Sequence, residues 1–152
     1  MWTLKSQLHG AGKDKSTKMW EEQIKPWFLE VWSKTNRAKD SKVSGALAEM
    51  CLNTNESFPD CVDTIINYVS AINKDDHRMI IFRLSDRSEE SEQSRIPSAY
   101  PEFILKLLHK LFEERPTWHN DYLKGILETI YEVEPKLKNK NEYQDLRKIV
   151  GI

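Results

Sequence analysis

The first candidate for chemistry is Gly12-Lys13, which stands in a basic, glycine-containing stretch near the start of the chain. A phosphate-binding loop requires a glycine five residues before such a pair and a serine or threonine directly after it. These positions hold Gln7 and Asp14, and a carboxylate beside phosphate groups would repel them. We therefore predict no nucleotide site and interpret residues 1–17 as a flexible basic N-terminal arm.

A second candidate is the pair of acids Asp60 and Glu134, which with their neighbouring prolines and Lys136 match the letters of a metal-dependent nuclease signature. That chemistry needs both acids on adjacent β-strands, so that they bind one divalent cation. Asp60 instead falls in the first turn of a predicted helix, where a negative charge is favourable, and Pro135 interrupts the other half. We predict a capping role for Asp60 and no nuclease.

Histidine and cysteine, the usual metal ligands and nucleophiles, are few and scattered. The histidines lie at positions 9, 77, 109 and 119, without the spacing of a metal motif. We expect His109 to be solvated, and Asp75-Asp76-His77 to provide turn and N-cap chemistry. Cys51 and Cys61 predict two buried thiols in a reducing cytosol. No catalytic residue, metal or cofactor is expected.

The tryptophan-rich segment over residues 20–32 is the best candidate for a contact surface, because Trp is enriched at binding hot spots. The alternative is that these rings fix the first helix onto the core. The basic linker that follows lacks an aromatic platform, so we do not expect nucleic-acid binding. The candidate partner-contact residues are Trp20, Trp27, Trp32, Lys34 and Arg37.

Apolar residues recur at helical spacing along most of the chain, which predicts an all-α fold of six or seven short helices. Pro26 should either kink the first helix or start a second one. The run Met79-Ile80-Ile81-Phe82 is compatible with a strand, but no partner strand is predicted, so we expect a helix there. The predicted helices cover residues 18–32, 41–53, 58–72, 77–84, 100–114, 121–133 and 142–150.

The pattern aromatic-proline-acid begins two of these helices, at Phe58-Pro59-Asp60 and again at Tyr100-Pro101-Glu102. The separation is typical of two-helix solenoid repeats, which span about 40–47 residues. It favours a HEAT-like stack of helical hairpins, with an irregular helical bundle as the alternative. The predicted core residues are Val62, Ile65, Ile66, Val69, Ile104, Leu105, Leu107, Leu108, Leu111, Ile126, Leu127 and Ile130.

Composition favours one folded domain over residues 18–152, with a polar loop at 85–98. The net charge of −1 is unevenly distributed. Residues 1–42 hold nine Lys and Arg against five Asp and Glu, and the remaining residues hold 14 Lys and Arg against 19 Asp and Glu. No apolar window reaches the roughly 18 residues of a membrane span, and the start lacks the apolar run of a signal peptide. We therefore expect a cytoplasmic protein that does not bind membranes.

A set of short motifs resembles the helical C-terminal segments of large bacterial proteins that follow sirtuin-like NAD-hydrolysing domains or ATPase modules implicated in phage defence. The resemblance covers most of residues 20–150, but none of that family's catalytic residues falls in this chain. It implies a scaffold or sensor segment of a bacterial defence system. The motifs are Trp27 with Trp32, Ser44 with Leu47-Ala48, Phe58-Pro59-Asp60-Cys61-Val62, Tyr100-Pro101 with Leu105, Leu107 and Leu108, and finally Leu146.

These observations predict a non-catalytic helical module that acts by contact with a protein partner. One alternative is a small immunity or antitoxin-type protein whose acidic body neutralises a basic partner. The other is an enzyme with a metal or nucleotide site assembled from scattered residues.

Overall fold

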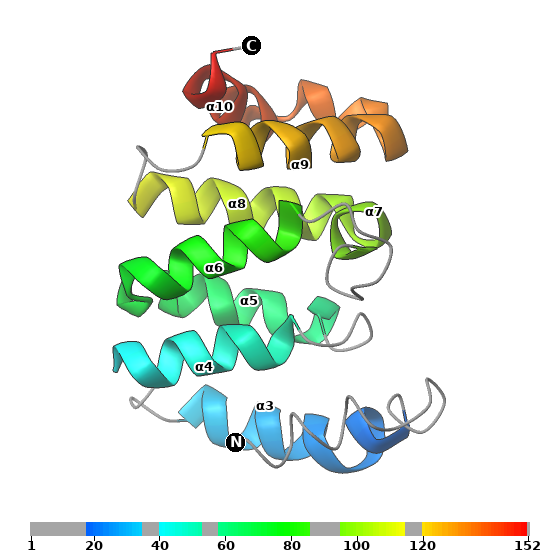
Figure 1. Cartoon of the computed structure of the whole chain (residues 1–152). Coiled ribbons are helices and arrows are strands. Elements are labelled where there is room, and N and C mark those ends of the chain that lie inside the picture. The colour runs from blue at the N-terminus through cyan, green and yellow to red at the C-terminus, as the bar shows by residue number, and fades with distance from the viewer. Residues whose placement is uncertain (1–17, 35–39, 53–57, 86–94, 115–119, 152) are drawn as a thin grey trace. The chain divides into compact units, whose positions relative to one another are not determined.

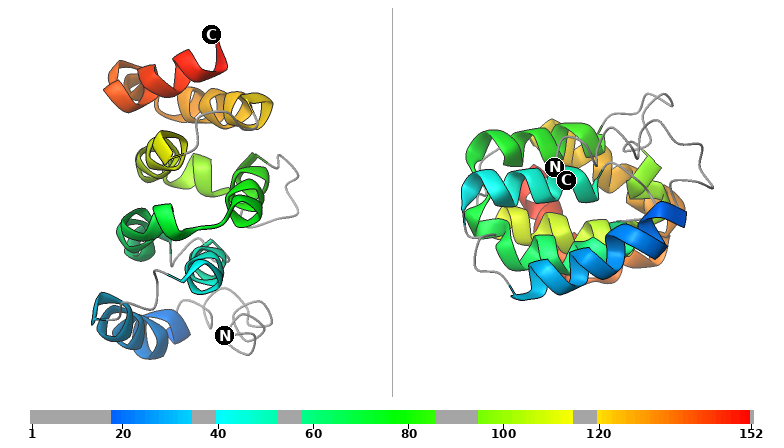
Figure 2. Two further views of the ribbon diagram at one scale, coloured as in Figure 1. Left: turned by 90° about the vertical axis from the view of Figure 1, so that its left-hand side faces the viewer. Right: turned by 90° about the horizontal axis from the view of Figure 1, so that it is seen from below.

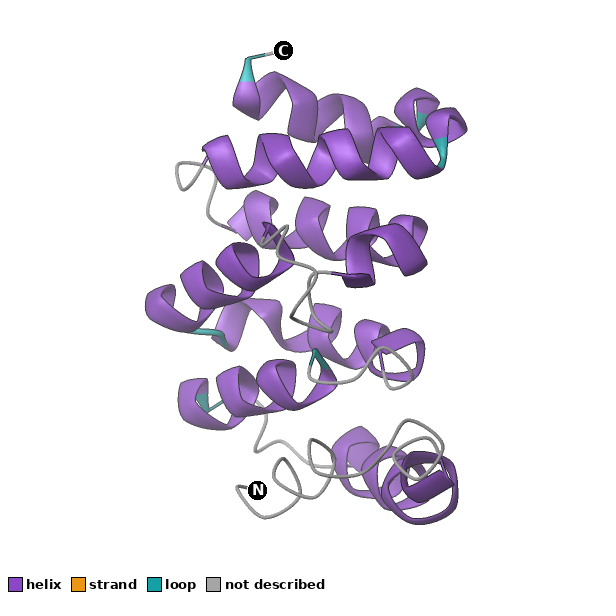
Figure 3. Ribbon diagram, turned by 45° about the vertical axis from the view of Figure 1, so that its right-hand side comes forward, coloured by secondary structure: helices purple, strands orange, loops and turns teal. Residues whose placement is uncertain are grey.

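The computed structural model describes residues 18–34, 40–52, 58–85, 95–114 and 120–151. All regular structure within these ranges is helical, which confirms the predicted all-α class (Figure 3). The predicted arm over residues 1–17, the contact candidate Arg37 and most of the predicted loop at 85–98 lie outside the described ranges.

Contacts within the chain define two compact units, the first ending at Ile72 and the second beginning at Asn73. The prediction of a single domain over 18–152 stays a prediction. The first unit contains η1 (Trp20–Ile24), α3 (Lys25–Lys34), α4 (Ser41–Cys51), α5 (Phe58–Tyr68) and η3 (Val69–Ala71). The second contains α6 (Lys74–Ser85), α7 (Ile96–Ala99), α8 (Pro101–Glu114), α9 (Asn120–Val133), η5 (Pro135–Asn139) and α10 (Asn141–Val150) (Figure 1).

In the first unit α5 contacts both α3 and α4, and α3 and α5 lie on the same side of the unit (Figure 2, left). Asp40 begins α4 by accepting the backbone N–H of Lys42 at 2.9 Å, which satisfies an otherwise unpaired helix donor. The large side chains buried in this unit are Trp20, Ile24, Phe28, Leu52, Phe58, Ile65 and Ile72.

Pro26 does not end the first helical segment. The backbone N–H of Lys25 donates to the carbonyl of Trp20, five residues back, so that the chain forms a π-turn immediately before the proline. A π-turn widens the helix locally, and a proline lacks the N–H that the regular α-helical ladder requires. The helix therefore continues as α3 with Pro26 in its first turn.

In the second unit α8 contacts α9 and α10, while α6 contacts α9. Seen end-on, α8 and α10 lie on one side of the unit and α6 and α9 on the other (Figure 2, left). The predicted core residues of both units are buried, except that Ile66 is only half-buried. Phe112, Leu123 and Leu146 complete the core of the second unit.

Residues 77–84 form part of α6, which confirms the helix prediction for the ambiguous apolar run. Asn73 begins this helix: its Oδ1 accepts the backbone N–H of Asp76 at 2.9 Å, and its Nδ2 donates to Asp76 Oδ2 at 2.7 Å. Asn73 is therefore the N-cap residue, and the predicted cap chemistry of the acidic cluster is confirmed only for Asp76, whose carboxylate binds the Asn73 side chain.

The predicted polar loop at 85–98 was too long at both ends. Ser85 belongs to α6, and α7 forms over Ile96–Ala99 because Ile96 and Pro97 are buried. The segment Pro135–Asn139, where no helix was predicted, likewise forms a short 3₁₀ helix, η5, fixed by the buried Leu137. Both short helices owe their formation to one or two buried apolar side chains, which is too weak a signal for periodicity to detect.

Candidate functional site

The structure separates the tryptophans that the sequence grouped together. Trp20 is buried, with 1% of its surface exposed, and its ring packs on the buried Phe28 at 5.8 Å between centroids. Trp27 is 43% exposed because it lies about 100° around the helix from Phe28. Trp32 and Lys34 lie farther along α3. Trp20 is therefore a core residue, as the alternative interpretation expected, and Trp27 is the exposed member of the pair.

Trp20 and Lys25 are both bound by the carboxylate of Asp60, in the first turn of α5. The indole Nε1–H of Trp20 donates to Asp60 Oδ2 at 3.0 Å, and the Lys25 ammonium lies 3.1 Å from Asp60 Oδ1. Glu21 also pairs with Lys25 at 3.1 Å. The hydrogen bonds to Asp60 and then to Glu21 raise the pKa of Lys25 above its usual value.

This network joins the first helical segment to α5 through one carboxylate. The predicted position of Asp60 in a helix first turn is confirmed, but its bound groups belong to another helix, which the capping prediction did not foresee. Both carboxylate oxygens are used. The geometry assigns Asp60 a role in fixing the orientation of α3.

The second copy of the aromatic-proline-acid pattern makes a comparable contact. Glu102, in the first turn of α8, forms an ion pair with Lys140, which follows η5. Beside this pair lies an open groove of about 450 Å³, with Tyr100, Phe103 and Leu137 in its lining. In both units, therefore, the acid of the pattern pairs with a lysine outside its own helix.

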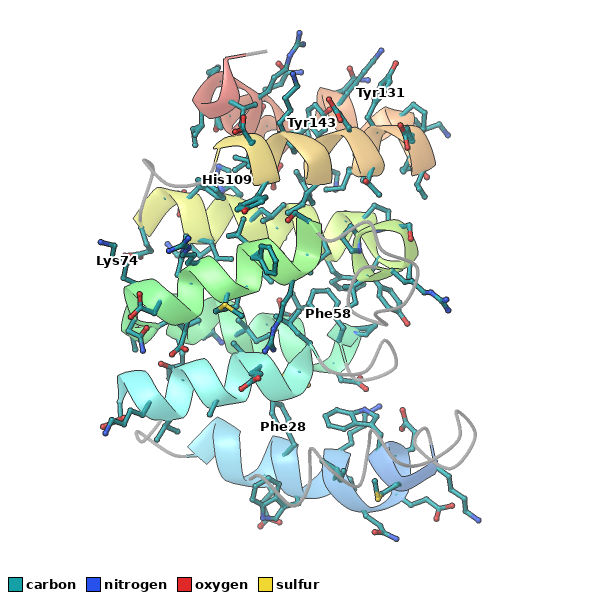
Figure 4. The ribbon with its side chains drawn as sticks, in the orientation of Figure 1. Phe28, Phe58, Lys74, His109, Tyr131 and Tyr143 are labelled. Atoms are coloured by element: carbon teal, nitrogen blue, oxygen red, sulfur yellow. The ribbon has the colours of Figure 1, made fainter. Side chains whose placement is uncertain are left out.

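His109 was predicted to be solvated, and the structure shows that its side chain is only partly so. Its side chain is 25% exposed on α8 (Figure 4), and α10 packs against this helix. Nε2 lies 3.5 Å from Asp145 Oδ2 on α10, and Nδ1 lies 3.7 Å from Glu113 Oε1. The hydrogen bonds from Lys148 and then His109 lower the pKa of Asp145.

His77 is buried in α6, and its Nε2 lies 3.1 Å from the carbonyl oxygen of Leu111 on α8. This carbonyl belongs to the last turn of α8, where side chains of other elements often bind the backbone carbonyls. The ring also meets Phe112 edge-on, with centroids 6.0 Å apart. His77 thus joins α6 to the last turn of α8 and has a structural role.

Cys51 and Cys61 are buried free thiols, as predicted. Burial, followed by the hydrogen bond with Cys61, raises the pKa of Cys51 well above its usual value. A thiol held in its protonated form is a poor nucleophile. Among the described residues, no group of three His, Cys, Asp or Glu side chains is arranged to hold a metal ion.

Sequence reasoning missed an exposed apolar surface in the second unit, which we call the α6–α9 patch. Met79 and Phe82 are 45% and 46% exposed on α6, and Phe82 meets the ring of Tyr122 from α9 edge-on at 5.6 Å. Asp75 and Arg78 complete the lining of an open hollow of about 360 Å³. The available signal was the four-residue apolar run, which is wider than one buried face of a helix.

Comparisons with protein-family models, with curated proteins and with solved structures found no match for this chain. Within the described ranges, no helix has both the length and the apolar character needed to cross a membrane.

Proposed function

We propose that this chain is a non-catalytic helical protein–protein interaction module that binds a protein partner through Trp27. The observation that supports this proposal is that Trp27 is 43% exposed on a helix whose opposite face is fixed to the rest of the first unit. Trp20 and Lys25 bind Asp60, and Phe28 is buried in the core. A large aromatic ring on a preorganised helix loses little conformational entropy on binding, which is why Trp is frequent at hot spots.

The arrangement of helices within each unit supports a HEAT-like repeat architecture for this module. In solenoid proteins, helices of one layer contact the equivalent helices of the next repeat. Helices that are not consecutive in the chain make such contacts here, α3 with α5 in the first unit, and α6 with α9 and α8 with α10 in the second. The shared pattern of Phe58-Pro59-Asp60 and Tyr100-Pro101-Glu102, each with its lysine partner, adds to this support.

The resemblance to helical segments of large bacterial defence proteins suggests the setting in which this module works. In this proposal it is a scaffold segment in the bacterial cytoplasm, without a cofactor of its own. Two free, buried thiols, Cys51 and Cys61, suit a reducing compartment.

The proposal is tested by size-exclusion chromatography of the full chain in a lysate of its source cells and in purified form at equal concentration. We expect the chain in the lysate to elute in a heavier assembly than the purified chain. Trp27→Ser should lose the heavier assembly while retaining its circular dichroism spectrum. The matched control Gln23→Ser, at an exposed polar position of the same helical segment, should keep it.

Elution of the lysate chain at the position of the purified chain would contradict the proposal. So would a heavier assembly that Trp27→Ser leaves intact.

A further inference from the structure

The α6–α9 patch exposes two large apolar side chains of α6 to water. Ile80, Ile81 and Leu84 already bury the inner face of α6, while Met79 and Phe82 project outward at 45% and 46% exposure. Isolated exposed apolar residues are common, but adjacent ones on a rigid surface mark interaction sites. Each square ångström of apolar surface removed from water contributes about 25 cal/mol. The patch therefore favours association.

The patch has a fixed shape. The ring of Phe82 meets Tyr122 edge-on, in one of the preferred geometries of aromatic pairs. Beside these rings lies the open hollow lined also by Met79. The hollow with its exposed methionine supplies a concave apolar feature on this surface. A flexible thioether adapts readily to an opposing apolar surface.

Asp75 and Arg78 lie at the same hollow, one turn apart on α6, and bring opposite charges to it. Within the part of the chain that the structure describes, neither group takes part in a hydrogen bond or an ion pair. Both are exposed, so water solvates them at present. The patch thus combines an apolar centre with one unpaired cation and one unpaired anion.

Such a surface is complementary to itself after a rotation of 180°. In a two-fold symmetric interface, residue i of one copy contacts residue j of the other, and j contacts i. We propose that the α6–α9 patch binds a second copy of this chain, with the two α6 helices antiparallel. Arg78 of each copy then pairs with Asp75 of the other near the two-fold axis, and the Met79, Phe82 and Tyr122 side chains flank these charge pairs. This surface is distinct from the one around Trp27, and its test is independent of the proposed function.

The size of the patch predicts a weak dimer. A stable protein–protein interface buries about 800 Å² on each partner, contributed by about 20–30 residues. The five side chains of the patch form only the centre of such an interface. We therefore expect monomer and dimer to coexist, with the dimer fraction rising as the protein concentration increases.

The experiment is sedimentation velocity of the purified full chain over a hundredfold range of concentration. We expect the wild-type mass to rise from monomer toward dimer, and both Arg78→Asp and Asp75→Arg to remain monomeric. In a homodimer of either variant, residue 78 of one copy and residue 75 of the other would carry charges of the same sign and repel each other. An equimolar mixture of the two variants should dimerise again, because each Asp of one variant then meets an Arg of the other.

The mixture separates an interface effect from misfolding, because a misfolded variant cannot recover by mixing with another one. The double variant Asp75→Arg/Arg78→Asp should likewise dimerise with itself. A wild-type chain that stays monomeric at every concentration would overturn the proposal and leave the patch to a partner of another sequence. Dimers that persist in Arg78→Asp, or monomers that persist in the mixture, would overturn it as well.

Discussion

At the scale of single residues, the polar side chains with the best-defined geometry join one helix to another. Asp60 binds Trp20 and Lys25, and His77 binds the carbonyl of Leu111. The sequence does not reveal such pairs, because they join residues that are tens of positions apart. Residue type and local spacing identified Asp60 as a first-turn acid and the Asp75-Asp76-His77 cluster as cap chemistry. They could not identify the partner helix.

The Asp60 network predicts that the loss of its two contacts lowers the free energy of unfolding by unequal amounts. Asp60→Ala leaves the indole N–H of the buried Trp20 without an acceptor, and we expect the free energy of unfolding to fall by about 1–3 kcal/mol. Lys25→Met removes only the ion pairs with Asp60 and Glu21, which water partly solvates, and its effect should be smaller. Urea denaturation followed by circular dichroism measures both.

Asn67→Ala is a matched control for Asp60→Ala, because Asn67 is an exposed position of the same helix. Its effect should be confined to the small change in helix propensity. An Asp60→Ala variant as stable as Asn67→Ala would show that the indole hydrogen bond contributes nothing to stability.

At the scale of helices, periodicity predicted more than any other signal. It located the buried faces of α5, α8 and α9, whereas Met79-Ile80-Ile81-Phe82 was assigned to a helix only because no partner strand was predicted. It failed where a run of apolar residues exceeded one face, as at Met79 and Phe82. Exposure of those two side chains depends on which helices pack against α6, and the sequence alone does not specify that arrangement. Trp20 was misassigned to a contact surface for the same reason.

The core assignment of α8 has a direct test in Leu108→Asp. Leu108 is fully buried, so the variant places an unpaired carboxylate in an apolar environment. We expect a loss of stability of several kcal/mol, as is typical of a buried and uncompensated charge. Phe103→Asp makes the same kind of change at an exposed position of the same helix and should have a far smaller effect.

Thermal denaturation followed by circular dichroism compares the two variants. Equal midpoints for Leu108→Asp and the parent chain would contradict the inward orientation of Leu108.

At the scale of the whole molecule, the two cysteines provide a chemical probe that reports the unfolding of the first unit only. Cys51 and Cys61 both lie before Ile72, and both are buried with no exposed surface. Circular dichroism, by contrast, reports the helices of both units. The two signals can therefore establish whether residues 18–152 unfold as the single domain that the composition predicted.

We predict one cooperative transition. Under native conditions both thiols should react with a disulfide reagent such as 5,5′-dithiobis(2-nitrobenzoic acid) at least about a hundredfold more slowly than in the urea-unfolded chain, because reaction requires local or global opening. Along a urea series, thiol exposure and loss of helix should share one midpoint, as a two-state domain requires. Leu108→Asp should shift both midpoints equally. Thiol protection that persists after half of the helical signal is lost would instead identify the first unit as an independently stable domain.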